Sequence, residues 1–209
     1  MKPLLRGQFH QASFFIALGA SSMLLAINQN PRLQLGLFIY TLGLCALFGI
    51  SALYHRINWP PKRRMWMRRL DHAAIFFMIS GTATPLCLVA LPQETSGEVL
   101  KITWSVAALG IVESLFWVKA PKWVTAFLCV LAGWAVFPYW SEFTSTLRRE
   151  QLDLLLSGGV IYTLGAVTYA LKRPNPSPQY FGYHEIFHVM VMIGAFLHFL
   201  MIYDLIKGP

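Results

Sequence analysis

The chain has 209 residues, of which 12% are charged and 56% are hydrophobic. A soluble domain carries about 25% charged residues, so this composition excludes a soluble globular enzyme, a disordered chain and a secreted disulfide-stabilised protein. The net charge of +8 does not indicate a nucleic-acid-binding protein, because the basic residues form short clusters between long apolar runs. The pattern predicts a multi-pass membrane protein.

Seven apolar runs are long enough to cross the hydrocarbon core of a bilayer as helices. They cover residues 11–27, 35–54, 72–91, 100–118, 123–139, 152–171 and 183–206. The basic segment 59–69 between the second and third runs is expected to be a solvated loop that contacts anionic head groups. No cleavage site of the A-x-A type follows the first run, so we expect a span there and not a secretion signal. The sequence predicts an all-α integral membrane protein, with residues 1–209 forming a single seven-transmembrane domain.

The lysines and arginines predict the orientation of this helix bundle. With seven spans, twelve of the seventeen basic residues fall on the side of the N-terminus and five fall on the other side. Because positively charged loops stay in the cytoplasm, we expect the N-terminus to be cytoplasmic and the C-terminus to lie outside.

Ionisable side chains in or beside membrane spans are costly, and each is therefore a candidate functional residue. The second span ends, and the third and seventh begin, on the same side of the membrane. The polar residues near these three ends are therefore predicted to lie at one depth; they are Ser51, His55, Asp71, His184 and His188.

The spacing of the histidines favours a metal site. His184 and His188 are four residues apart and share one face of a helix. With His55 from a facing helix they form a three-histidine set with an open fourth position, which suits zinc. A histidine pair of this spacing also occurs as simple packing or hydrogen bonding. A third histidine, a carboxylate and a hydroxyl at the same depth favour the metal site.

Four further ionisable residues fit this site less well. His198 follows His188 by ten residues, or about 15 Å along a helix, so we expect a buried, hydrogen-bonded histidine outside the site. His72 points away from Asp71, and Glu185 lies off the face of His184 and His188. Glu113 could reach the periphery of the site or pair with a basic residue of a loop, and we expect the pair.

Several motifs of the chain resemble the bacterial hemolysin III family, whose relatives are the progestin and adipoQ receptors. The resemblance is carried by Ser-Ala-Leu-Tyr-His at 51–55, Leu-Asp-His at 70–72, Gly-Thr-Ala-Thr-Pro at 81–85, Gly-Gly-Val-Ile-Tyr at 158–162 and His-Glu-Ile-Phe-His at 184–188. It extends over nearly the whole chain. One departure is Ala195, where the family often has a serine.

The resemblance implies a membrane-embedded metal hydrolase, because the wider superfamily includes alkaline ceramidases. It implies that His55, His184 and His188 bind zinc, that Asp71 holds the attacking water as the general base, and that Ser51 is the nearby hydroxyl. The substrate would be a lipid amide or ester, and the protein would lie in the bacterial inner membrane.

Three other functions remain open at this point. A membrane sensor or regulator with a structural zinc ion would need the same ligands. A cytolytic protein is suggested by the family name, although the sequence shows no additional amphipathic helix that could insert into a target membrane. A transporter is disfavoured because the ionisable residues cluster at one end of the spans.

Overall fold

The computed structural model describes residue 3 and residues 5–207, which form helices joined by short loops. In this part of the chain, seven helical segments are long and apolar enough to cross a membrane. They are α1 (Gln8–Ile27), α2 (Pro31–Arg56), α3 (Pro61–Ala90), α4 (Gln93–Phe116), the combined segment α5 (Lys122–Trp134), η1 (Phe137–Tyr139) and α6 (Trp140–Thr146), then α7 (Arg149–Leu171) and α8 (Tyr183–Lys207). The predicted all-α, seven-span architecture is confirmed.

Prolines mark the beginnings of four of these helices. Pro31 and Pro61 are the first residues of α2 and α3, and α4 and α5 directly follow Pro92 and Pro121. Proline suits the first helical position because its fixed φ is helical and its missing N–H would have no partner there. The expectation of a loop over 59–69 is therefore wrong from residue 61 onward. The basic side chains of this segment project from the first turns of α3, whose lysine, arginine and methionine residues favour a helix.

The fifth crossing is not the continuous helix expected over residues 123–139. Helix α5 ends at Trp134, and the chain passes through the 3₁₀ turn η1 into α6, which completes the crossing. Pro138 lies at the beginning of η1, where its lack of an N–H group is tolerated.

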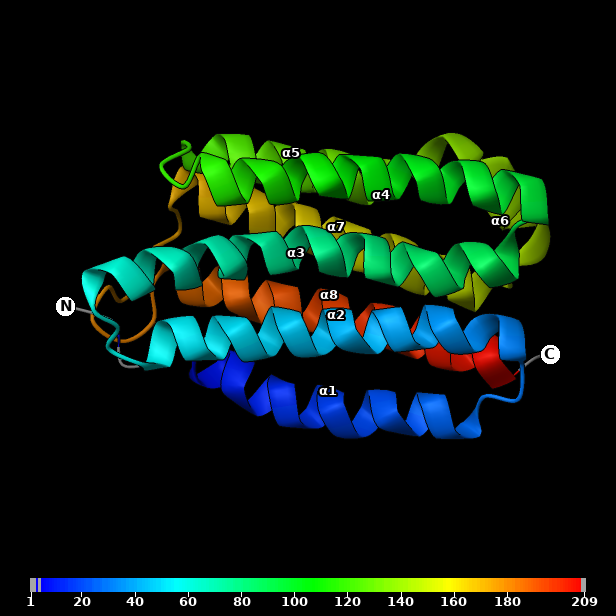
Figure 1. Cartoon of the computed structure of the whole chain (residues 1–209), viewed down its shortest axis with the longest axis horizontal. Helices are drawn as coiled ribbons and strands as arrows, with labels where there is room; N and C mark the ends of the chain where they lie inside the picture. The colour runs from blue at the N-terminus through cyan, green and yellow to red at the C-terminus, as the bar shows by residue number, and fades with distance from the viewer. Residues whose placement is uncertain (1–2, 4, 208–209) are drawn as a thin grey trace.

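The helices run side by side along the long axis of the bundle (Figure 1). Helices α1, α2, α3 and α4 each pack against the next one, α5 packs against α4 and α7, and α7 packs against α8. Helix α8 closes the bundle because it also contacts α1 and α3. We call the end at which α1, α3, α5 and α8 begin the basic end.

The outer surface of the bundle is apolar, and much of its interior carries small or polar residues. Phe116 and Ile16 are 82% and 71% exposed, as suits side chains that face lipid. Several buried hydroxyls donate to backbone carbonyls: Thr84 donates to Ser80 within α3, and Ser80 donates to Thr103 of α4 at 2.9 Å. Small and hydroxyl-bearing residues at such contacts allow close packing of membrane helices.

Candidate metal centre

Three helices bring the predicted polar residues together at the basic end. Ser51 and His55 lie in the last two turns of α2, Asp71 lies in α3, and His184 and His188 lie in the first two turns of α8. Ser51, His55 and His188 are at most 7% exposed. Residues far apart in the sequence therefore meet at one depth of the bundle, as the alternation of the spans predicts.

The three histidines form a compact cluster in which each ring faces the other two. The Nε2 atoms of His55 and His184 are 3.2 Å apart, and the His184 and His188 ring centroids are 4.5 Å apart. One nitrogen from each ring lies within 4.8 Å of those of the other two. In a tetrahedral zinc site, metal–nitrogen distances of about 2.0–2.1 Å separate two ligand nitrogens by about 3.3 Å. The separation between His55 and His184 matches this value, and the three histidines could together hold a metal ion.

A carboxylate and a hydroxyl border the cluster. The Asp71 Oδ2 atom is 3.7 Å from Nε2 of His55, and its side chain is 12% exposed. The Ser51 hydroxyl interacts with the same carboxylate. Asp71 thus lies where it can contact either a metal ion or a water molecule beside it, and Ser51 adds a hydrogen-bond donor.

A fourth histidine, His10 of α1, lies against the cluster. Its ring stacks on that of His188 with centroids 3.9 Å apart and planes 8° from parallel. His10 is 2% exposed, and neither ring nitrogen has a hydrogen bond of normal geometry among the described residues. Because parallel stacked rings do not direct their nitrogens at one point, we expect His10 to orient His188 rather than to bind the same ion. The sequence analysis missed it, although its place beside the first predicted span put it at the same depth.

An ion pair ties the beginning of α1 to the beginning of α8. Arg6 pairs with Glu185, which is 1% exposed, and the second carboxylate oxygen accepts from the N–H of Gly182 at 2.9 Å. Glu185 therefore points away from the metal cluster, as its helical position predicts. The pair lies close in sequence to the stack of His10 on His188, because Arg6 and Glu185 precede these two residues by four and three positions.

Gly7 sets how closely α1 approaches α2. Its φ of 81° lies in the left-handed region, and a Cβ atom there would lie 2.7 Å from Cβ of His55. Both the conformation and the close approach require glycine.

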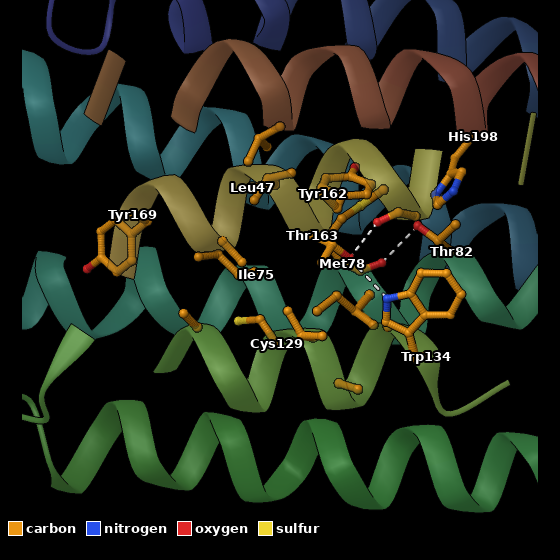
Figure 2. A pocket seen from close by; sticks show the side chains of 18 of the residues that line it. Leu47, Ile75, Met78, Thr82, Cys129, Trp134, Tyr162, Thr163, Tyr169 and His198 are labelled. Atoms are coloured by element: carbon orange, nitrogen blue, oxygen red, sulfur yellow. Dashed lines mark hydrogen bonds between the residues drawn. The ribbon is translucent and has the colours of Figure 1, made fainter. Parts of the chain in front are cut away.

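A long cavity extends from the cluster into the bundle. At the basic end its lining includes Ser51, Asp71, His10, His184 and His188. Its middle is mostly apolar, and Figure 2 shows labelled lining residues that extend from Tyr169 to Trp134 and His198. His188 and His198 both line it, so it is at least about 15 Å long. This is half of the roughly 30 Å hydrocarbon core, the depth of one lipid acyl chain.

The other ionisable residues that were considered lie apart from the cluster. His198 is buried at the far end of the cavity, 3.2 Å from the carbonyl of Leu155, which confirms the expectation of a hydrogen-bonded histidine outside the site. Glu113 accepts from Thr125 of α5 at 3.1 Å, so the expected pairing with a basic loop residue is wrong. His72 lines the cavity near Asp71.

The fold and the cluster define a class: multi-pass membrane proteins with a possible three-histidine metal site inside the helix bundle. Comparison with known families narrows this class. The model of the family described as haemolysin-III related matches residues 1–199. The chain belongs to this family.

Individual relatives include bacterial and animal proteins. The chain is 27% identical to Hemolysin-3 of Bacillus cereus over 161 residues, which are 77% of this chain and 70% of the relative. It is 29% identical to the Hemolysin-3 homolog of Bacillus subtilis over 172 residues, 82% and 78% of the two chains. It is 25% identical to the human monocyte to macrophage differentiation factor over 201 residues, 92% and 80%. Adiponectin receptor-like proteins also match, which confirms the relation to the progestin and adipoQ receptor family.

Proposed function

We propose that the protein is a zinc-dependent hydrolase of lipid amides or esters, with its site near the cytoplasmic face of the bacterial inner membrane. The observation that carries this proposal is the opening of the three-histidine cluster, with Asp71 and Ser51 beside it, into a long apolar cavity. A site that combines metal ligands, a carboxylate and space for one acyl chain suits hydrolysis of an acylated lipid.

The cavity and the cluster would have different roles in such a reaction. The apolar middle of the cavity would bind the acyl chain and place its carbonyl carbon beside the histidines. When bound to His55, His184 and His188, zinc would supply a Lewis acid that acidifies water and polarises a carbonyl.

Asp71 would transfer the proton, and Ser51 would stabilise the negative charge that develops during the reaction. The Asp71 carboxylate would accept a proton from the attacking water and return it to the leaving amine or alcohol. The Ser51 hydroxyl would donate a hydrogen bond to the oxygen on which negative charge develops. Burial of both groups strengthens these interactions, because less water competes for them.

The proposal is tested by following fatty acid release from purified protein in detergent micelles. Substrates are matched N-acyl and O-acyl lipids, with protein that is untreated, chelator-treated, or chelator-treated and reloaded with zinc. We expect release that chelation removes and zinc restores. A protein that holds zinc and releases no fatty acid from any of these lipids would contradict the hydrolase.

A second function, a sensor or regulator with a structural zinc ion, is favoured by one distance. Asp71 Oδ2 lies 3.7 Å from Nε2 of His55, close enough for a small movement to make it a fourth ligand. A closed tetrahedral site would stabilise the contacts of α2, α3 and α8 without an open position for water. Substitution of Asp71 separates the two functions, as described in the Discussion.

Cytolysis is a third candidate, suggested by the name Hemolysin-3 of the Bacillus cereus relative. The buried cluster and the internal cavity give no support to a direct lytic role. Leakage of dye from liposomes on addition of the purified protein would favour it.

A further inference from the structure

The basic residues at the basic end fall into two groups. Lys62, Arg63, Arg64 and Lys119 are exposed, as expected for charges that meet water or head groups. Arg6, Arg68, Arg69 and Lys122 are half-buried. Arg6 pairs with Glu185 and Arg69 lies over the Trp66 ring, whereas Arg68 and Lys122 lie beside the metal cluster. The positive-inside rule accounts for the first group, since orientation requires only that basic residues remain on one side. The rule does not explain why the side chains of Arg68 and Lys122 are partly buried.

Two tyrosines hold the ammonium group of Lys122. The Nζ atom donates to the Tyr183 hydroxyl at 2.6 Å and lies 4.3 Å and 4.5 Å from the ring centroids of Tyr169 and Tyr183. Contact with an aromatic face stabilises a cation without neutralising it. The tyrosines therefore fix the position of the positive charge and leave the ammonium group with further donors.

This charge lies beside the end of the cavity at which the histidines cluster, which we call the mouth of the cavity. Tyr169 lines the cavity, and its ring centroid is 5.9 Å from that of His184. Lys122 also interacts electrostatically with His72 and His184. One aromatic ring therefore separates the ammonium group from the metal cluster.

Arg68 approaches the same mouth from α3. It precedes Asp71 by three residues and so lies on the same helical face. It interacts electrostatically with Asp71 and with Tyr169. Across the described residues, no carboxylate lies within ion-pair distance of Arg68 or Lys122. Lys122, which the tyrosines hold in place, and Arg68 thus both lie near Tyr169 without an ion pair to a carboxylate of the described residues.

We propose that Lys122 and Arg68 form an anion site that holds the phosphate head group of a lipid whose acyl chain lies in the cavity. The site rests on the proposed function and narrows its substrates to acylated lipids with a phosphate beside the acyl linkage. A phosphate accepts several charge-assisted hydrogen bonds and suits both an ammonium and a guanidinium group. The placement is consistent with a lipid, because the phosphate would lie at the mouth, the acyl linkage at the histidines and the chain in the apolar middle.

Binding tests this site without requiring turnover or zinc. Calorimetry on purified protein in detergent micelles, with and without chelator, compares dioctanoyl phosphatidate with dioctanoylglycerol, which has the same chains and no phosphate. Inorganic phosphate is the third probe. The variants are Lys122→Gln and Arg68→Gln, and the matched control is Lys119→Gln, which removes an exposed charge three residues from Lys122. Lys122→Arg retains the charge.

We expect wild-type protein to bind phosphatidate at least tenfold more tightly than dioctanoylglycerol or inorganic phosphate. Each glutamine variant should lose about tenfold in phosphatidate affinity, the loss of one charge-assisted contact. Lys119→Gln should bind as wild type does, and Lys122→Arg should recover most of the affinity. If Lys122→Gln does not fold, Arg68→Gln carries the same test.

Three results would overturn the head-group site. The first is equal affinity for phosphatidate and dioctanoylglycerol. The second is an equal loss of phosphatidate affinity in Lys119→Gln and Lys122→Gln. The third is binding of inorganic phosphate as tight as that of phosphatidate, which would indicate a site for the free anion. Failure of hydrolysis with phosphatidate binding intact would contradict only the proposed function.

Discussion

His188 and His198 lie on the same helix and line the same cavity, yet their surroundings differ. His188 faces His55 and His184 and stacks on His10, so its neighbours are other imidazoles. His198 contacts the carbonyl of Leu155, as a structural histidine does. A buried histidine with a backbone partner is explained by packing. A buried histidine that is surrounded by three other histidines is instead a candidate metal ligand.

The ion pairs at the two ends of the bundle differ in how far they are exposed to solvent. At the basic end, Glu185 of the Arg6 pair is 1% exposed. At the opposite end, the Arg148 and Asp204 side chains are 49% and 35% exposed, and Gln151 also donates to Asp204. The basic end thus combines a buried charge with a cluster of candidate metal ligands, whereas the opposite end has a solvent-exposed ion pair. The comparison predicts that function concentrates at one end.

The largest effect on activity is expected from Asp71→Asn. This variant tests whether the site at the basic end is catalytic or structural. Asparagine keeps the shape but accepts a proton far less readily. Fatty acid release should fall by about 10²- to 10⁴-fold while zinc content stays at the wild-type level. Zinc content and release are measured on the same preparation. Loss of zinc in this variant would indicate that Asp71 is a ligand, and would favour the structural site.

Arg6→Gln compares the two ion pairs. Removing Arg6 leaves the buried Glu185 carboxylate without its charge partner, which should lower the free energy of unfolding by about 3 kcal/mol. The matched change Arg148→Gln removes a solvated partner and should cost less than about 1 kcal/mol. Denaturant titration in detergent measures both. Equal losses would show that the two pairs do not differ in energy.

Gly158→Ala tests the far end of the cavity. A Cβ atom at this position would lie 2.3 Å from Cδ2 of His198, so the ring must move and its contact with Leu155 must weaken. We expect a loss of about 2 kcal/mol in unfolding free energy and unchanged zinc content. Gly159→Ala is the control, since its Cβ would meet only Trp134 at 3.7 Å. Loss of zinc in Gly158→Ala would mean that the two ends are coupled.

The smallest effect is expected at His10. His10→Ala removes the ring that stacks on His188 and should weaken zinc affinity about tenfold, as changes beside metal ligands do. His10→Phe keeps a stacking ring without nitrogens and should retain wild-type affinity. Competition with a zinc chelator measures both. An equal loss in the two variants would assign the effect to the imidazole nitrogens and not to stacking.

Much of the fold could be predicted because the bilayer imposes a simple length rule on apolar runs. The same rule misplaced the beginning of α3, because it detects the hydrocarbon core and not the helical turns that Pro61 starts outside it. It also missed the break between α5 and α6, where the apolar pattern continues although the helix does not.

The candidate site was predictable to the extent that it depends on spacing and on the alternation of spans. These placed His55, Asp71, His184 and His188 at one depth. The stacking of His10, the Arg6–Glu185 pair and the position of Lys122 over Tyr169 could not be predicted. They depend on which helices become neighbours across the bundle, and hydropathy carries no information about that.

The most direct test of the metal centre is the zinc content of three purified proteins: wild type, His188→Ala and His198→Ala. Both substitutions remove a buried histidine of α8 that lines the cavity, so they are matched in chemistry and in helix. We predict one zinc ion per chain in wild type and in His198→Ala, and less than about a tenth of that in His188→Ala. Equal zinc in the two variants, or none in wild type, would contradict the assignment.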